Sequence, residues 1–172
     1  MNALVTTEGG VPAASQQPDQ QQYLTFTLNG ELFAIGILVI KEIIEYGQLT
    51  EVPMMPDFIR GVINLRGAVV PVVDLSARFG RQETRVTRRS CIVIVELQAE
   101  GEQQVIGVMV DAVNEVLEIP ADQIEPPPSF GARIRPDFIA GMGQVNGKFV
   151  ILLNVDHVLS VEELAELSRV AG

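Results

Sequence analysis

The sequence contains no tryptophan, a single cysteine and a single histidine, and these shortages exclude several kinds of functional site. One cysteine, Cys91, can form neither an internal disulfide nor a cysteine-based metal cluster. It lies in the strand-like run CIVIVEL, where a small buried hydrophobe is a better interpretation than a catalytic thiol. His157 has no second histidine with which to share a metal ion. We therefore expect neither a metal site nor a cofactor.

Long apolar runs are also missing, although 47% of the residues are hydrophobic and the mean hydropathy is +0.27. No run reaches the roughly 20 apolar residues that a transmembrane helix needs, so direct membrane insertion is not expected. The N-terminus has no basic start and no apolar segment typical of a secretory signal, and the expected location is the cytoplasm. The chain has no glycine-rich phosphate loop, histidine cluster or nucleophile elbow, so no catalytic residue and no enzymatic activity are predicted.

The charge is strongly negative overall but unevenly distributed. A net charge of −10 argues against general nucleic-acid binding. Seven of the ten arginines nevertheless lie between Arg60 and Arg89, where only Asp74 and Glu83 oppose them. The favoured interpretation of the stretch RFGRQETRVTRR is a solvated loop. The alternative is a basic patch that faces an acidic protein partner.

One stretch of the sequence occurs twice. PDFIRGVINLRG at residues 56–67 returns as PDFIAGMGQVNG at residues 136–147, an offset of 80. Weaker matches place Phe26 over Val95 at an offset of 69, Ile35-Gly36 over Ile106-Gly107 at 71, and EIIE (42–45) over EVLE (115–118) at 73. Because the offset grows only across expected turns and loops, the pattern is typical of a tandem duplication.

The spacing of glycine and proline along the chain predicts a mainly β fold. Short strand-like runs recur every 8–12 residues between Gly and Pro, which favours small closed β-barrels, and two copies predict two barrels packed on each other. The first strand is expected at residues 23–28, with a hairpin turn at Asn29-Gly30 and a second strand over ELFAIGILVI. Residues 1–22 should be a disordered tail, and Ser160-x-x-Glu163 predicts a capped C-terminal helix over 160–172. The domain would cover 23–159, with approximate halves 23–88 and 89–159 that are free to exchange strands.

Arg66 has no counterpart in the second copy, which has Asn146 at the tip of the corresponding hairpin. A type I′ hairpin turn wants a positive φ at this position, which arginine tolerates poorly. Either Gly67 alone takes the positive φ in another turn type, or a strain of about 1 kcal/mol is tolerated because the side chain is needed. A solvated arginine and one that reaches a partner are equally compatible with the pattern. Asp74 and Asn154 also correspond, and capping of the following segment explains them best.

Four segments together resemble the CheW family of bacterial chemotaxis coupling proteins: residues 23–46, 56–75, 105–119 and 138–155. The pattern GVxNLRGxxxPxxDL at 61–75 is highly specific to this family and also occurs in the kinase CheA and in CheV. Those two carry a catalytic core or a receiver domain, for which 172 residues leave no room. The family usually has an acidic residue where this chain has Gly36, so the likeness is weaker there.

The resemblance implies two SH3-like five-stranded barrels, packed face to face, and a non-enzymatic adaptor. The adaptor would join the regulatory domain of the CheA histidine kinase to the cytoplasmic tips of chemoreceptors (methyl-accepting chemotaxis proteins) in membrane-associated arrays. Carried over by position, the receptor-binding groove would contain Ile37, Ile40, Glu42, Gly61 and Arg66, with Arg66 and Glu42 as an ion pair. A paralogous scaffold of a twitching or gliding array is the alternative, and a small-ligand-binding barrel is less favoured.

Overall fold

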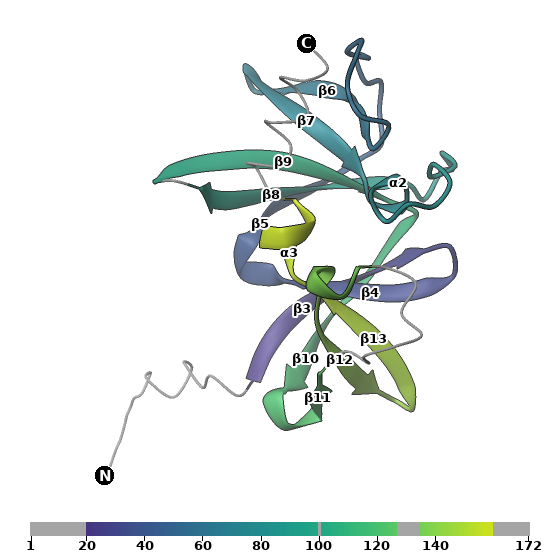
Figure 1. Ribbon diagram of the computed structural model, residues 1–172, viewed down its shortest axis with the longest axis vertical. Helices are drawn as coiled ribbons and strands as arrows, with labels where there is room; N and C mark the ends of the chain where they lie inside the picture. Colours follow the sequence, from purple (N-terminus) through teal and green to yellow (C-terminus); the bar gives the residue numbers. More distant parts are fainter. Residues whose placement is uncertain (1–19, 100, 127–134, 160–172) are drawn as a thin grey trace.

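The protein folds into two β-sheets that occupy the upper and lower parts of the molecule in Figure 1, with a short helix between them. The computed structural model describes residues 20–99, 101–126 and 135–159. The six-stranded sheet has the order β10 (Ala112–Pro120), β3 (Gln20–Leu28), β4 (Glu31–Gly36), β13 (Lys148–Leu153), β12 (Ile139–Val145), β11 (Ile124–Glu125). The five-stranded sheet has the order β5 (Ile40–Glu45), β8 (Cys91–Ala99), β9 (Glu102–Val110), β7 (Ala68–Asp74), β6 (Ile59–Leu65).

Short helical segments join the strands. They are the 3₁₀ turns η2 (Ile37–Val39), η3 (Ala121–Gln123) and η4 (Pro136–Phe138), and the helices α2 (Leu75–Arg78) and α3 (Val155–Val158). β10 continues through η3 into β11, which pairs with β12 at the opposite edge of the six-stranded sheet. The chain after β5 does the same in the five-stranded sheet, where Thr50 bridges to Val62 of β6. Each sheet is thereby curled into a barrel, which leaves fewer strand edges exposed.

The duplication is confirmed, and the third strand of each copy crosses to the other sheet. The strand orders β10-β3-β4-β13-β12 and β5-β8-β9-β7-β6 become identical when β3 to β7 are matched with β8, β9, β10, β12 and β13. The last hairpins agree residue by residue, since Ile59 pairs with Val73 and Ile139 with Leu153, each followed by a bulge. Neither barrel is therefore built from one half of the sequence.

Equivalent positions of the two copies are 69 residues apart in β3 and β8, 73 residues apart in β4 and β9, and 80 residues apart in the last hairpins. Leu24 pairs with Ile35 in the first copy, and Val93 pairs with Val108 in the second. Val108, 73 positions after Ile35, is thus its structural equivalent, and the predicted match to Ile106 is wrong by two residues. The β8–β9 hairpin is longer than its twin, and short apolar runs match equally well at either offset.

Two predicted boundaries also change. The second strand does not run through ELFAIGILVI but ends at Gly36, because η2 turns the chain and β5 joins the other sheet. The first strand begins at Gln20, three residues before the predicted start, since Gln20 pairs with Pro120 at the end of β10. The rest of the predicted tail, residues 1–19, and the predicted C-terminal helix, 160–172, lie outside the described residues.

The largest hydrophobic cluster fills the space between the barrels and draws on both. A row of aromatic rings crosses it, with successive centroids 5.6 to 6.1 Å apart: Phe26, Phe33, Phe79 and Phe138. The Arg78 guanidinium lies 4.9 Å from the ring centre of Phe58 and 4.8 Å from that of Phe138, the two phenylalanines of the repeated PDFI motif. Its Nε donates a 2.7 Å hydrogen bond to the carbonyl of Val158 in α3. The repeat therefore serves to dock one barrel on the other.

Candidate functional site

Arg66 occupies a left-handed backbone conformation at the tip of the β6–β7 hairpin. Its φ is +52° and that of Gly67 is +89°, nearly the same as +51° and +77° for Asn146 and Gly147 in the second copy. Both tips are thus type I′ turns, and of the two alternatives the strained one holds. The Gly67 N–H donates a 3.0 Å hydrogen bond to Asn64 Oδ1, which steadies the turn. Arg66 thus has a left-handed backbone conformation that arginine tolerates poorly, at the position where the second copy has Asn146, a residue that adopts it readily.

The side chain of Arg66 forms an ion pair with Glu42, Nη2 to Oε2. Glu42 lies on β5 and Arg66 at the end of β6, which are opposite edge strands of the five-stranded sheet. The contact therefore joins the two edges of the barrel formed by the five-stranded sheet, which we call the first barrel; the second barrel is the one formed by the six-stranded sheet. Arg66 is 69% exposed and Glu42 27%, so the pair is open to solvent on the arginine side. In the second barrel the equivalent positions hold Glu115 and the uncharged Asn146, which cannot form an ion pair.

Ile37 and Ile40 flank the corner where the chain passes from one barrel to the other. Both are partly buried and pack against the cluster between the barrels. Leu38 lies between them in η2 and is 96% exposed, the most exposed large hydrophobic side chain among the described residues. Sequence reasoning missed Leu38 because it assigned residues 37–40 to a strand. The run Ile37-Leu38-Val39 could have indicated an exposed apolar side chain, because a 3₁₀ turn cannot bury three successive residues.

Gly61 is buried, and a backbone contact explains why glycine is needed. A Cβ at this position would lie 2.5 Å from the carbonyl oxygen of Thr50, and the φ of +154° is one that other residues rarely adopt. Thr50 comes this close because it exchanges backbone hydrogen bonds of 2.9 and 2.8 Å with Val62. Of the five predicted groove residues, the structure brings Glu42 and Arg66 into contact and places Ile37 and Ile40 on one corner. Gly61 lies on the hairpin that carries Arg66 but faces the chain around Thr50.

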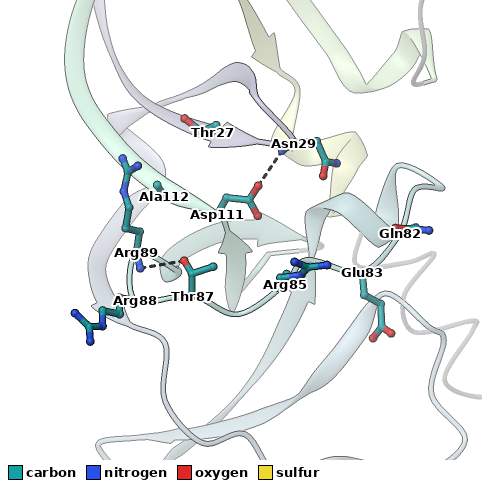
Figure 2. A pocket seen from close by; sticks show the side chains of 10 residues that line it. All are labelled: Thr27, Asn29, Gln82, Glu83, Arg85, Thr87, Arg88, Arg89, Asp111 and Ala112. Atoms are coloured by element: carbon teal, nitrogen blue, oxygen red, sulfur yellow. Dashed lines mark hydrogen bonds between the residues drawn. The ribbon is translucent and has the colours of Figure 1, made fainter.

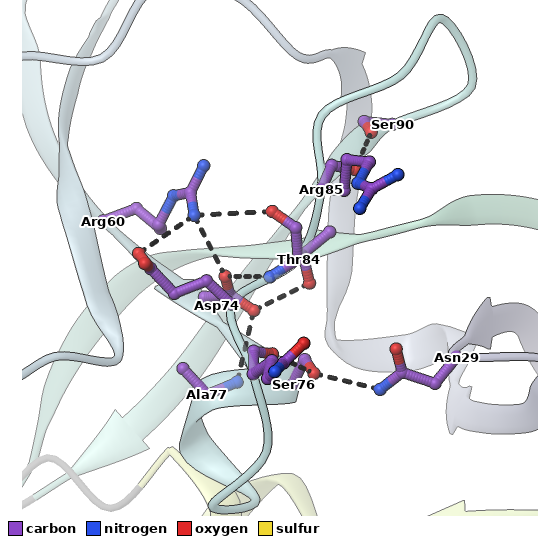
Figure 3. A network of polar contacts seen from close by, with 10 residues as sticks. Asn29, Arg60, Asp74, Ser76, Ala77, Thr84, Arg85 and Ser90 are labelled. Atoms are coloured by element: carbon purple, nitrogen blue, oxygen red, sulfur yellow. Dashed lines mark hydrogen bonds and ion pairs between the residues drawn. The ribbon is translucent and has the colours of Figure 1, made fainter.

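Asp74 is fully buried and all its contacts are structural (Figure 3). It caps α2 by accepting a 3.3 Å hydrogen bond from the Ala77 N–H, as predicted, and Asn154 caps α3 in the same way from His157. Asp74 also accepts from the N–H and the hydroxyl of Thr84, both at 2.8 Å, and lies 3.4 Å from Arg60 Nη1. The sequence did not reveal the Arg60 and Thr84 contacts, because they depend on how the loop after α2 folds back.

The charge of Arg60 is favoured by its surroundings. Burial alone would lower the pKa of its guanidinium, but a hydrogen bond with Tyr46 and the nearby Asp74 and Glu83 raise it above the ordinary value. A buried carboxylate with this partner and two hydrogen bonds from Thr84 has its charge satisfied, so the cluster holds the loop to the barrel. Among the described residues, no three His, Cys, Asp or Glu side chains are grouped so as to hold a metal ion.

No helix in the described part of the chain is long and apolar enough to cross a membrane.

Comparison with known proteins gives a consistent match over nearly the whole chain. The family model for the CheW-like domain matches residues 22–163. The chemotaxis protein CheW of Klebsiella aerogenes is 36% identical over 151 residues, which cover 88% of this chain and 89% of the relative. The protein FrzA of Myxococcus xanthus is 28% identical over 158 residues, covering 91% and 96% of the two chains.

A solved structure shares the fold. The scaffolding protein TtCheW from Thermoanaerobacter tengcongensis superposes with a TM-score of 0.72 at 35% identity, covering 80% of this chain and 86% of that one. The fold, the family model and the relatives thus agree with the resemblance carried by the GVxNLRGxxxPxxDL segment. The chain belongs to the CheW-like domain family, and over most of its length it matches the CheW proteins, which are the non-enzymatic scaffold proteins of bacterial chemotaxis.

Proposed function

We propose that this protein is the adaptor that couples chemoreceptors to the histidine kinase CheA. Membership of the chemotaxis scaffold family supports the general role. The observation that carries the specific role is the ion pair of Arg66 and Glu42, which only the first of two otherwise equivalent barrels has. A strained backbone conformation lowers stability, so it is expected to persist where the side chain has a function. The strained residue here is Arg66, whose side chain is exposed.

In this proposal the receptor docks beside the corner between the barrels. The cytoplasmic tip of a chemoreceptor would present an amphipathic helix. Its apolar face would pack against apolar side chains, and a contact with charged side chains would set its orientation. Ile37, Leu38 and Ile40 would provide the apolar contacts, and the Arg66–Glu42 pair would fix the charge and shape of the groove. Gly61 would contribute indirectly, because it allows the chain around Thr50 to close the barrel behind the hairpin. The regulatory domain of CheA would bind elsewhere on the barrels, and the complex would act in the cytoplasm at membrane-associated arrays.

The test is a reconstituted kinase assay with the full chain, CheA, a receptor signalling fragment and ATP. We expect CheA autophosphorylation to rise several-fold only when receptor and adaptor are both present. The adaptor alone should neither bind nor hydrolyse ATP. ATP turnover that follows the adaptor through further purification would contradict the proposal.

A second candidate is a paralogous scaffold of a gliding or twitching array. The match to FrzA, which covers 96% of that protein, favours keeping it. The same assay separates the two if it is run with the CheA-type kinase of each chemosensory system in the organism. Stimulation of a surface-motility kinase, with no effect on the swimming kinase, would favour the second candidate. No observation on the described residues favours a small-ligand-binding barrel.

A further inference from the structure

The loop between α2 and β8, residues 81–90, carries the highest concentration of positive charge in an otherwise acidic protein, and we call it the basic loop. Four of its ten residues are arginines, in a chain with a net charge of −10. Arg81 is neutralised by Glu31, at 2.6 Å. Arg85, Arg88 and Arg89 are exposed, and none has a carboxylate partner among the described residues. Three guanidinium groups are therefore available to an external anionic group.

The basic loop is held in shape at both ends. At one end Thr84 is buried and bonded twice to Asp74. At the other end Ser90 is buried, and its hydroxyl oxygen accepts a 2.8 Å hydrogen bond from the Thr87 N–H. The Arg89 N–H donates at 3.1 Å to the Thr87 hydroxyl within the same turn. A loop fixed in this way presents its arginines at a lower entropic cost than a flexible tail would.

A cavity of about 810 Å³ lies beside the basic loop and has walls from both barrels (Figure 2). Thr27 and Asn29 of the β3–β4 hairpin line one side, with Asp111 and Ala112 at the passage from β9 to β10. This wall is also fixed, because the Asn29 N–H donates to Asp111 Oδ2 at 2.8 Å and Asn29 Nδ2 donates to Ser76 Oγ at 3.0 Å. The two carboxylates of the lining are already engaged, since Glu83 pairs with Arg60 at 3.2 Å and Asp111 accepts from Asn29. The pocket thus combines a preformed polar wall with a rim of three arginines.

The arrangement of the charges indicates what would bind. In Figure 2 the side chains of Arg85, Arg88 and Arg89 point in different directions rather than converging on one point. A single phosphate or carboxylate needs convergent donors, whereas an extended segment with several carboxylates can meet one arginine after another. Nucleic acid is disfavoured because the rest of the chain is strongly acidic and no aromatic side chain lines the cavity for base stacking.

We propose that the basic loop and its cavity bind an extended acidic segment of a protein partner. None of the lining residues belongs to the groove proposed for the receptor helix, so this is a separate interaction surface. Charge complementarity of this kind raises association rates and selects among partners more than it raises affinity. The proposal depends on neither the receptor nor the kinase, and its test uses neither.

The test measures binding of a fluorescent 12-residue peptide, in which Asp and Glu alternate with Gly and Ser, by anisotropy at low salt. The test variant is the double substitution Arg88→Glu and Arg89→Glu. The matched control is Lys41→Glu with Lys148→Glu, the only two lysines of the chain, which changes the net charge by the same amount. All four positions are exposed, so both variants should fold. We expect the arginine variant to bind at least about tenfold more weakly and the lysine variant to stay within about twofold.

Two further measurements locate the site and identify its ligand class. Addition of the peptide should shift the amide resonances of Thr27, Asn29, Thr87 and Asp111, and raising the salt concentration should reverse the shifts. Equal weakening in both double variants, or no salt-sensitive binding, would overturn the proposal. Displacement of the peptide by equimolar inorganic phosphate would show a single-anion site instead. Tighter binding of a DNA or RNA oligomer than of the peptide would show a nucleic-acid site, and either result would contradict an acidic protein partner.

Discussion

Replacing Arg66 by asparagine separates the function of the ion pair from the stability of the hairpin. The substitution gives the first copy the residue that its twin uses at the same turn, Asn146, whose φ of +51° is almost that of Arg66 at +52°. Asparagine adopts this left-handed conformation readily, so the type I′ turn should persist. The short amide cannot reach across to β5, and the pair with Glu42 is lost.

The expected change in stability is small because two effects oppose each other. With Arg66 mostly exposed, the pair with Glu42 should contribute about 0.2–1 kcal/mol. Relief of the left-handed arginine should return about 1 kcal/mol. The net change in the free energy of unfolding is therefore between zero and a gain of about 0.8 kcal/mol, which corresponds to a rise in Tm of at most roughly 2–4 °C for a domain of this size.

Function should change much more than stability. We expect Arg66→Asn to weaken binding of a receptor signalling fragment and to lower receptor-dependent stimulation of the kinase, both several-fold. Glu42→Gln should do the same, and the double variant should be no worse than the more impaired single variant, as for two partners in one interaction. Lys148→Asn is the control, because it removes an exposed cation beside the equivalent turn of the second copy.

Two results would refute this reasoning. If Arg66→Asn unfolds well below the native protein, the arginine has a structural role that the contacts do not account for. If it folds and stimulates the kinase normally, Arg66 is not part of the receptor-binding surface. A double variant whose loss equals the sum of the two single losses would show that the ion pair itself has no functional role.

Three other outcomes can be checked by denaturation. Gly61→Ala should cost about 2–4 kcal/mol of unfolding free energy, because the new methyl group meets a backbone carbonyl at an unfavourable φ, whereas Gly36→Ala enters open space and should cost less than about 1 kcal/mol. Asp74→Asn should cost about 2–4 kcal/mol by leaving buried partners unmatched, against about 1 kcal/mol for loss of the cap in Asn154→Ala. The hydrogen bond from Arg135 lowers the pKa of Asp137. The stability that this hydrogen bond contributes is present above the ordinary carboxyl pKa and is lost as pH falls through the lowered value. In Asp137→Asn the free energy of unfolding should therefore depend less steeply on pH, and only below about pH 4.

Local features of the fold could be read from the sequence because adjacent residues determine them. The Asn-Gly turns, the repeated PDFI segment and the caps at Asp74 and Asn154 each depend on a few consecutive side chains, and all are present. The duplication itself follows from the sequence, since two copies of one hairpin register need no knowledge of their surroundings. The position of Arg66 at a hairpin tip was predictable for the same reason. Its pairing with Glu42 came only from the resemblance to a known family.

The tertiary structure alone decided which barrel each strand joins. β5 alternates half-buried and exposed residues, a pattern that suits the edge of either sheet, and packing between the barrels places it beside β8. That crossing turns the chain at η2 and exposes Leu38, and the closure of the barrel brings Glu42 within reach of Arg66. The Arg60, Asp74 and Thr84 cluster likewise joins residues of three separate segments. Such contacts arise only when distant segments bury a common surface, and no local pattern records which segments those are.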